Sequence, residues 1–318
     1  MGGVHAAAWQ ATDAALVAIL EHTTDSRVGS MGQYGATIYT DLESFLDAVD
    51  IVDICAPTHL HAHFALAAAA AGKPTICEKP LALTSDEGRT VLEAFESKGL
   101  LLQVGHVLRF SPEYDAARRA VASGDIGDIA VLRLSRLSFA PKRGRDSWFN
   151  DDAKSGGIIF DLMIHDLDYA RWVAGDVVSV FAKSAVGGQG HAIAVLQHTD
   201  GAISHIEASW SNPPPVFRTI GEIAGSEGVL TFSSEASTPL VARLHVENND
   251  ASTGSGNHLL AANPFELELQ HFLDLLDGGV RPVLTAYDAL EAVRLAEATH
   301  KSASIGRPVL LETSEGAS

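Results

Sequence analysis

Short runs of β-branched and aliphatic residues alternate with longer alanine-rich stretches over the first third of the chain. The short runs at 16–20, 51–55, 75–77 and 100–105 predict strands, and the stretches at 60–71 and 85–97 predict helices. Strands and helices that alternate at these lengths are typical of βαβ units, in which neighbouring strands are parallel. The pattern therefore predicts an α/β protein with a Rossmann-type, doubly wound parallel sheet.

The pattern of predicted helices and strands changes after residue 110. A helix at 112–122, a strand at 129–137 and a helix at 159–173 come first. Strand-like runs separated by short polar turns then follow at 177–183, 192–198, 203–209, 219–224, 229–232 and 240–246. Consecutive strands of this kind favour an α+β domain with an open, mainly antiparallel sheet. The Asn-, Gly- and Ser-rich segment 248–258 predicts a surface loop, and helices are expected at 264–276 and 286–302.

This change of pattern predicts two domains. Residues 1–106 form the expected dinucleotide-binding domain, and residues 107–318 form a substrate and oligomerisation domain. The helix at 286–304 is expected to pack back on the first domain. A chain of 318 residues that is 46% hydrophobic and 19% charged has enough apolar surface to build two cores.

The charge balance narrows the classes of partner. Forty acidic residues against 22 basic ones give a formal charge of −18, which repels nucleic-acid phosphates and anionic lipid. Nucleic acid and membranes are therefore not expected partners. Cys55 and Cys77, the two cysteines, both lie in apolar runs, which favours reduced thiols and a cytoplasmic protein.

The first residues look like the end of a phosphate-binding turn, because Gly2 opens an alanine-rich helix. A complete fingerprint has a preceding strand and the pattern G-x-G-x-x-G, so an ordinary N-terminal helix is the alternative. We interpret the chain as N-terminally truncated, and we expect the strands beside the absent first strand to keep open inner edges. Glu21 ends the next strand, where a carboxylate accepts a hydrogen bond from a ribose 2′-hydroxyl and repels a 2′-phosphate. Met1, Gly2 and Glu21 are therefore expected to contact NAD rather than NADP.

A second group of polar residues follows the strand at 75–77. Glu78, Lys79 and Pro80 stand at the carboxyl edge of the parallel sheet, where open α/β folds bind ligands. Lys79 could donate to a substrate hydroxyl, and its positive charge would favour loss of the hydroxyl proton. The alternative is a solvated Glu-Lys turn that leads into a helix.

A third group lies on the helix at 159–173. Asp161 and His165 are four residues apart and would share one face of that helix. A carboxylate beside an imidazole can fix its tautomer, which makes His165 a candidate general base, although a helix-surface contact is the alternative. His59, His61 and His63 do not predict a metal site, because their i,i+2 spacing spreads them around a helix.

Taken together, these motifs resemble the Gfo/Idh/MocA family, which includes glucose–fructose oxidoreductase and inositol dehydrogenase. The resemblance rests on 2–5, 56–61, 78–80, 105–112, 161–168 and 306–309, together with the helix at 286–302. It implies that His165 removes a hydroxyl proton while hydride passes from the same carbon to nicotinamide, and that Asp161 and Lys79 hold and polarise the substrate.

The resemblance also implies the remaining site residues. The cofactor would lie against Ala56, Pro57, Thr58, His61, Glu78, Lys79 and Pro80, with a cis bond between Lys79 and Pro80. Arg109 and Trp148, with Arg145, are the candidates for substrate contact. Val107 and Leu108 replace the polar or basic pair of many relatives, which puts substrate contacts from that loop in doubt. A homodimer or homotetramer is expected.

The sequence thus predicts an NAD-dependent dehydrogenase that acts on the CH–OH group of a sugar, polyol or related secondary alcohol. Two alternatives stay open because the dinucleotide turn is incomplete. The chain could be a non-catalytic sensor that binds NAD or a sugar, or an inactive, truncated dehydrogenase.

Overall fold

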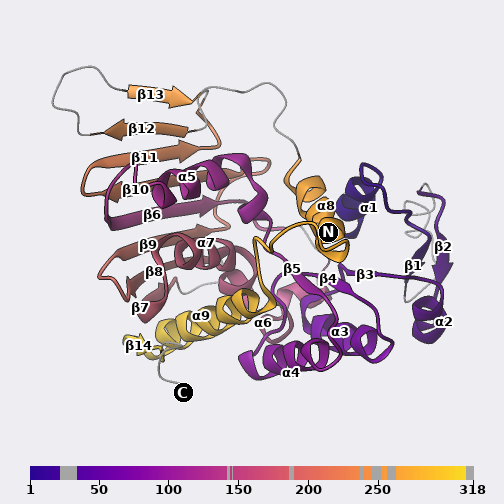
Figure 1. Ribbon diagram of the computed structural model, residues 1–318. Coiled ribbons are helices and arrows are strands. Elements are labelled where there is room, and N and C mark those ends of the chain that lie inside the picture. The colour runs from indigo at the N-terminus through magenta and orange to yellow at the C-terminus, as the bar shows by residue number, and fades with distance from the viewer. Residues whose placement is uncertain are drawn as a thin grey trace. The chain divides into compact units, whose positions relative to one another are not determined.

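The computed structural model describes residues 1–21, 34–141, 144, 146–185, 190–236, 240–244, 252–255 and 263–312. Contacts divide the chain into two compact units (Figure 1), Met1–Phe110 with Ala262–Leu290, and Ser111–Ala261 with Glu291–Ser318. The predicted second domain covered all of 107–318, whereas the structure groups 262–290 with the first unit. The packing of 286–304 on the first domain stays a prediction.

The described strands of the first unit are parallel and form two separate sheets. β1 (Ala18–Leu20) pairs with β2 (Thr37–Tyr39), and β4 (Thr75–Glu78) lies between β3 (Val52–Ile54) and β5 (Leu102–Gly105). The parallel pairing confirms the predicted Rossmann-like fold. No strand among the described residues joins β1 to β3.

Helices fill the connections between these strands. They are α1 (Gly2–Trp9), α2 (Leu42–Asp47), α3 (His61–Ala70) and α4 (Ser85–Glu96), with the 3-10 turns η3 (Thr58–Leu60) and η4 (Val107–Phe110). The Thr84 side chain caps α4 by accepting a hydrogen bond of 3.2 Å from the N–H of Glu87. On α3, Ala65, Ala68 and Ala69 are buried, because small side chains let the helix pack closely on the sheet.

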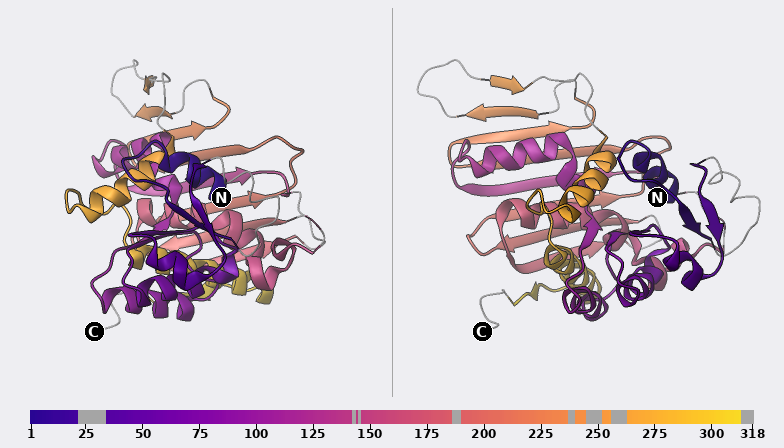
Figure 2. Two further views of the ribbon diagram at one scale, coloured as in Figure 1. Left: turned by 90° about the vertical axis from the view of Figure 1, so that its right-hand side faces the viewer. Right: turned by 45° about the vertical axis from the view of Figure 1, so that its right-hand side comes forward.

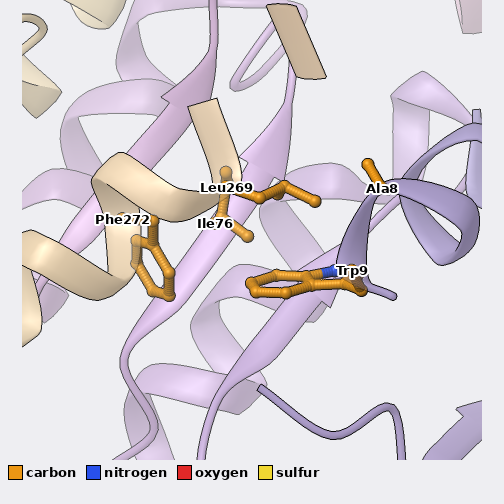
Figure 3. Close-up of a cluster of buried hydrophobic side chains, with 5 residues drawn as sticks. All are labelled: Ala8, Trp9, Ile76, Leu269 and Phe272. Carbon is orange, nitrogen blue, oxygen red and sulfur yellow. The ribbon is translucent and has the colours of Figure 1, made fainter. Parts of the chain in front are cut away.

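A helix from late in the sequence completes the first unit. α8 (Pro264–Leu276) begins at the capping residue Asn263 and buries Leu269 and Phe272. Figure 3 shows these side chains gathered with Ile76 of β4 and with Ala8 and Trp9 of α1. This shared core joins α1 to α8, which is why 262–290 belong with the first unit rather than with the residues that precede them.

The second unit is built on a nine-stranded sheet. Its strands are β6 (Ile129–Leu137), β7 (Val177–Ser184), β8 (His191–His198), β9 (Ile203–Ser209), β10 (Arg218–Gly225), β11 (Gly228–Ser233), β12 (Leu240–Leu244), β13 (Ser252–Ser255) and β14 (Val309–Leu310), in the order β13-β12-β11-β10-β6-β9-β8-β7-β14. Every pair is antiparallel except β6 and β9, which confirms the predicted sheet. The prediction of a loop at 248–258 is wrong for Ser252–Ser255, because these residues pair with β12 as an edge strand.

Helices lie over one face of this sheet (Figures 1 and 2). They are α5 (Pro112–Ala122), α7 (Ile164–Ala174) and the longer α9 (Ala286–Ile305), while η5 (Trp148–Asn150), α6 (Asp152–Ser155) and the π turn η6 (Ile159–Met163) lead into α7. Along β8, Ala192, Ala194 and Leu196 are buried, whereas Ile193 and Val195 are exposed. This alternation places the core between the sheet and the helices, and no described helix covers the other face, which we call the open face.

Among the described residues, no helix is long and apolar enough to cross a membrane.

Candidate active site

Several predicted cofactor residues of the first unit stand at or after the carboxyl ends of its parallel strands, whereas Met1 and Gly2 stand at the start of α1. Glu21 follows β1 and donates its N–H to the carbonyl of Tyr39 at 2.9 Å. Ala56, Pro57 and Thr58 follow β3, and Glu78 is the last residue of β4. Carboxyl ends of parallel strands form the edge at which such sheets bind ligands.

His61 connects two of these loops. Its Nδ1 lies 2.7 Å from the carbonyl oxygen of Pro80, and its Nε2 lies 2.9 Å from that of Ala56. Burial lowers the pKa of His61, so the ring is neutral near pH 7 and donates to one carbonyl at a time. His59 and His63 are exposed, and His59 lies in η3, before α3 begins at His61.

The turn after β4 is held by its own carboxylate. The peptide bond between Lys79 and Pro80 is cis, as expected. Glu78 is buried, and its Oε2 accepts a hydrogen bond of 3.1 Å from the N–H of Lys79. The side chain of Glu78 therefore fixes the backbone at the residue whose ammonium group is the candidate substrate contact. Glu78 is also part of a larger network.

The network contains a residue that the sequence analysis did not single out. His5 of α1 is buried, with Nδ1 2.9 Å from Asp53 Oδ2 and Nε2 3.0 Å from Glu78 Oε1. Trp9 donates its indole N–H to Asp53 at 2.7 Å. Burial lowers the pKa of His5, but the charge of Asp53 and the hydrogen bonds to both carboxylates raise it well above its ordinary value. His5 therefore carries a positive charge between two anions.

His5, Asp53 and Cys55 also lie close enough together to hold a metal ion, with one ligand atom from each within 4.8 Å of the others. Both ring nitrogens of His5 already face carboxylate oxygens. Burial and the charge of Asp53 raise the pKa of Cys55 to about 12, which keeps the thiol neutral and a poor ligand. These side chains satisfy one another without an ion.

The predicted catalytic helix lies in the second unit. It is not a regular α-helix from its start, because the N–H of Ile164 bonds to the carbonyl of Ile159, five residues earlier. The first turn is therefore a π turn that contains Asp161, and α7 continues from it with His165 in its first turn. The helix predicted at 159–173 is therefore present, and its first turn is a π turn. π turns of this length occur frequently at functional sites.

The start of this helix requires glycine. Gly156 has a φ of 74°, in the left-handed region, and a Cβ atom on it would lie 2.4 Å from the Cβ of Phe160. A side chain at 156 would collide with the π turn, so the Gly156-Gly157 pair is part of the local fold.

A buried ion pair holds α7 on the sheet. Arg136 of β6 donates to Asp166 through Nε at 2.7 Å and through Nη2 at 2.9 Å. Arg136 Nη2 also lies 3.3 Å from the hydroxyl of Tyr114. Asp166 directly follows His165, so this bidentate pair fixes the helix at the position of the candidate base.

The candidates for substrate contact differ in their surroundings. Arg109 is buried, and its Nη1 donates to the carbonyl of Val283 at 3.1 Å and lies 3.5 Å from Asp288. Trp148 opens η5 and packs edge-on against Phe149. Arg145 lies outside the described residues. The substrate roles of Arg109 and Trp148 stay predictions.

Two family models match the chain. The model described as the oxidoreductase family with an NAD-binding Rossmann fold matches residues 1–106, and that of the GFO/IDH/MocA C-terminal domain matches residues 114–231. The chain belongs to the Gfo/Idh/MocA family. This confirms the predicted family, its oxidoreductase class and NAD as its cofactor.

Individual relatives of this Gfo/Idh/MocA protein are similar over nearly its whole length. A D-apiose dehydrogenase of Paraburkholderia graminis is 31% identical over 98% of this chain and 87% of the relative. An inositol 2-dehydrogenase of Rhizobium meliloti is 28% identical over 97% of this chain and 96% of the relative. A solved levoglucosan dehydrogenase in complex with NADH and L-sorbose has a TM-score of 0.89 at 23% identity, over 98% of this chain and 96% of that one.

The residues present fit the cofactor of the Gfo/Idh/MocA family. The carboxylate of Glu21 and the loops after β3 and β4 lie at the ligand-binding ends of their strands. The first turn of α1 has no side-chain cap, so its N–H groups lack a side-chain acceptor, and such groups favour an anionic ligand. Lys79 lies in the first unit, and Asp161 and His165 lie in the second.

Proposed function

We propose that this protein oxidises a secondary alcohol of a sugar or polyol, with NAD as the acceptor of the hydride. The observation that carries the proposal is the turn at Lys79, where a buried carboxylate fixes a lysine at the carboxyl end of β4. The names of the relatives, D-apiose dehydrogenase and inositol 2-dehydrogenase, support a polyhydroxylated substrate.

In the proposed mechanism, Lys79 donates a hydrogen bond to the substrate hydroxyl and stabilises negative charge as that oxygen loses its proton. His165 is the general base that takes the proton, and Asp161 orients the substrate. When NAD is bound, it would supply the acceptor for the hydride that leaves the same carbon. General-base catalysis contributes roughly 10²–10⁴-fold to a rate of this kind.

The proposed cofactor contacts are those at the strand ends. Glu21 would accept from a ribose hydroxyl, which disfavours the 2′-phosphate of NADP. Met1 and Gly2 at the start of α1 would face the pyrophosphate. The nicotinamide and its ribose would lie against Ala56, Pro57, Thr58, His61, Glu78, Lys79 and Pro80.

The test offers the chain NAD with a panel of pentoses, hexoses, anhydrosugars and inositols and follows the absorbance of NADH. We expect turnover with at least one member, and we expect His165→Asn to lower kcat about 10²–10⁴-fold. His63→Gln, an exposed histidine of the first unit, is the matched control and should keep the full rate. Thermal stabilisation by NAD without turnover on any alcohol would instead favour the non-catalytic sensor.

We further propose a cytoplasmic homodimer or homotetramer. Both cysteines, Cys55 and Cys77, are free thiols, which suits a reducing compartment. The open face of the second unit carries exposed apolar side chains on neighbouring strands, namely Phe181, Ile193, Val195 and Ile203. Exposed apolar side chains gathered on one sheet face typically mark a surface that binds another protein, and we assign this face to a second copy of the chain.

A further inference from the structure

One buried carboxylate connects α1 to the turn that carries Lys79. Glu78 is 5% exposed, and its two oxygens have different partners. Oε1 lies 3.0 Å from His5 Nε2, and Oε2 accepts the N–H of Lys79 at 3.1 Å. Because the carboxylate is planar, the direction of the first bond sets the direction of the second.

The imidazole on the other side of Glu78 is itself held in place. His5 Nδ1 lies 2.9 Å from Asp53, which also accepts the indole N–H of Trp9. Carboxylate oxygens are acceptors only, so a ring that bonds to carboxylates through both nitrogens carries a proton on each. His5 is therefore an imidazolium that spans β3 and β4 from α1.

The charge of His5 also depends on the other titratable groups around it. Burial and the charge of Glu78 raise the pKa of Glu268 on α8 well above its ordinary value, so that carboxyl is uncharged. Burial likewise keeps the thiol of Cys55 neutral. Burial by itself would raise the pKa of Glu78, but the hydrogen bond and charge of His5 outweigh it and lower that pKa. The charge of Lys79 contributes in the same direction, whereas the ring of His61 would do so only if it were protonated.

We propose that His5 is a positioning residue for the dehydrogenase reaction. Its imidazolium orients Glu78, and Glu78 holds the peptide of Lys79 at the edge where the substrate hydroxyl is bound. His5 contacts neither substrate nor cofactor in this role. The effect on the reaction rate rests on the proposed function, whereas the charge of His5 and its effect on the Lys79 peptide do not.

The first experiment therefore needs no substrate. Nitrogen NMR of the wild-type chain labelled with ¹⁵N-histidine should show the His5 ring protonated on both nitrogens from about pH 5 to pH 9, far beyond an ordinary histidine. In a ¹⁵N-lysine sample, the Lys79 amide resonance should shift in His5→Gln and stay in place in His63→Gln. A His5 ring that is neutral at pH 8, or an unmoved Lys79 amide, overturns the inference.

The second experiment measures the reaction. In His5→Gln, Lys79 is misplaced, so kcat normalised to the number of NADH-binding sites should fall by about 10- to 100-fold. The KM for the alcohol should stay nearly unchanged. Because Glu78 loses its cationic partner, it protonates at higher pH, and the acid limb of the plot of kcat against pH should shift to higher pH. A residue that only supports folding would lower the number of NADH-binding sites and leave this profile in place.

A double variant tests whether His5 acts through Glu78. If it does, His5→Gln combined with Glu78→Gln should be no slower than Glu78→Gln by itself, because the second change removes the same interaction. If the fold-loss in kcat of the double variant equals the product of the two single-variant losses, the inference is overturned. If the wild-type chain oxidises no alcohol, the proposed function fails, and the NMR results still decide the charge of His5 and its hold on Lys79.

Discussion

Buried charges in the first unit are compensated side chain by side chain. His5 holds its positive charge because Asp53 and Glu78 both contact it, and Glu268, which has no such partner, is neutral. A buried charge is tolerated only where a partner offsets the loss of hydration. The same reasoning predicts how the two cysteines behave, since neither has a cationic partner that would outweigh burial.

Thiol labelling tests whether burial keeps the two cysteines unreactive. Burial raises the pKa of Cys55 to about 12 and that of Cys77 well above its ordinary value. Since the thiolate is the reactive form, only about one Cys55 in 10⁴ is reactive at pH 8, roughly a thousandfold fewer than for an ordinary cysteine. A disulfide reagent at pH 8 should therefore label the native chain slowly and the chain in guanidinium at once. Rapid labelling of one thiol in native Cys77→Ser would contradict the raised pKa of Cys55.

Sequence patterns located most elements because each depends on residues close together along the chain. The strand predicted at 129–137 and the helix at 112–122 have the observed bounds, since alternation and a proline at the helix start are local signals. The role of His5 could not be found this way, because its partners lie 48 and 73 residues away. A hint was present in Asp53, an acid inside an otherwise apolar strand, which needs a partner when it is buried.

One element prediction was incomplete and another was wrong, each for a physical reason. The π turn at Ile159–Met163 accommodates one more residue than an α turn, and a hydrophobic pattern does not report this. The segment Ser252–Ser255 has the composition of a loop, yet its backbone pairs with β12 at the edge of the sheet. Backbone pairing does not depend on side-chain type, so composition misleads most at sheet edges. The roles of Asp161 and His165 stay predictions.

The ion pair beneath α7 gives a prediction at element scale. Asp166 and Arg136 have side chains that are 1% and 5% exposed, so Asp166→Ala would leave a buried guanidinium without its carboxylate. We expect the free energy of unfolding to fall by about 3–5 kcal/mol, measured by urea titration. Glu222→Gln removes one partner of the exposed pair with Arg133 and is the matched control, with an expected loss of about 0–1 kcal/mol. Equal losses would show that the buried pair does not hold the helix.

For the molecule as a whole, the open face of the second unit carries exposed apolar side chains that have no role inside the described part of one chain. Val195 of β8 stands opposite Phe181 of β7 on one side and His205 of β9 on the other. Neighbouring side chains on one face of a sheet act together, so Phe181, Val195 and Ile203 form one apolar patch. A monomer would leave this patch in water.

Burying the patch against a second copy would place Val195 of each chain in a dry interface. Val195→Lys would then introduce an ammonium group without a partner, and a cost of about 3 kcal/mol per dimer raises the dissociation constant about 100-fold or more. Light scattering coupled to size exclusion should therefore show a monomer at concentrations where the wild-type chain is a dimer or tetramer. Val280→Lys is the matched control, because Val280 is 43% exposed against 40% for Val195 but lies in the first unit.

A wild-type monomer at those concentrations would refute the assignment of the face, and a Val195→Lys chain that still assembles would move the interface elsewhere. The melting temperature of the variant monomer and its NAD binding should show that the fold of each unit is intact, so that lost assembly cannot be mistaken for lost folding.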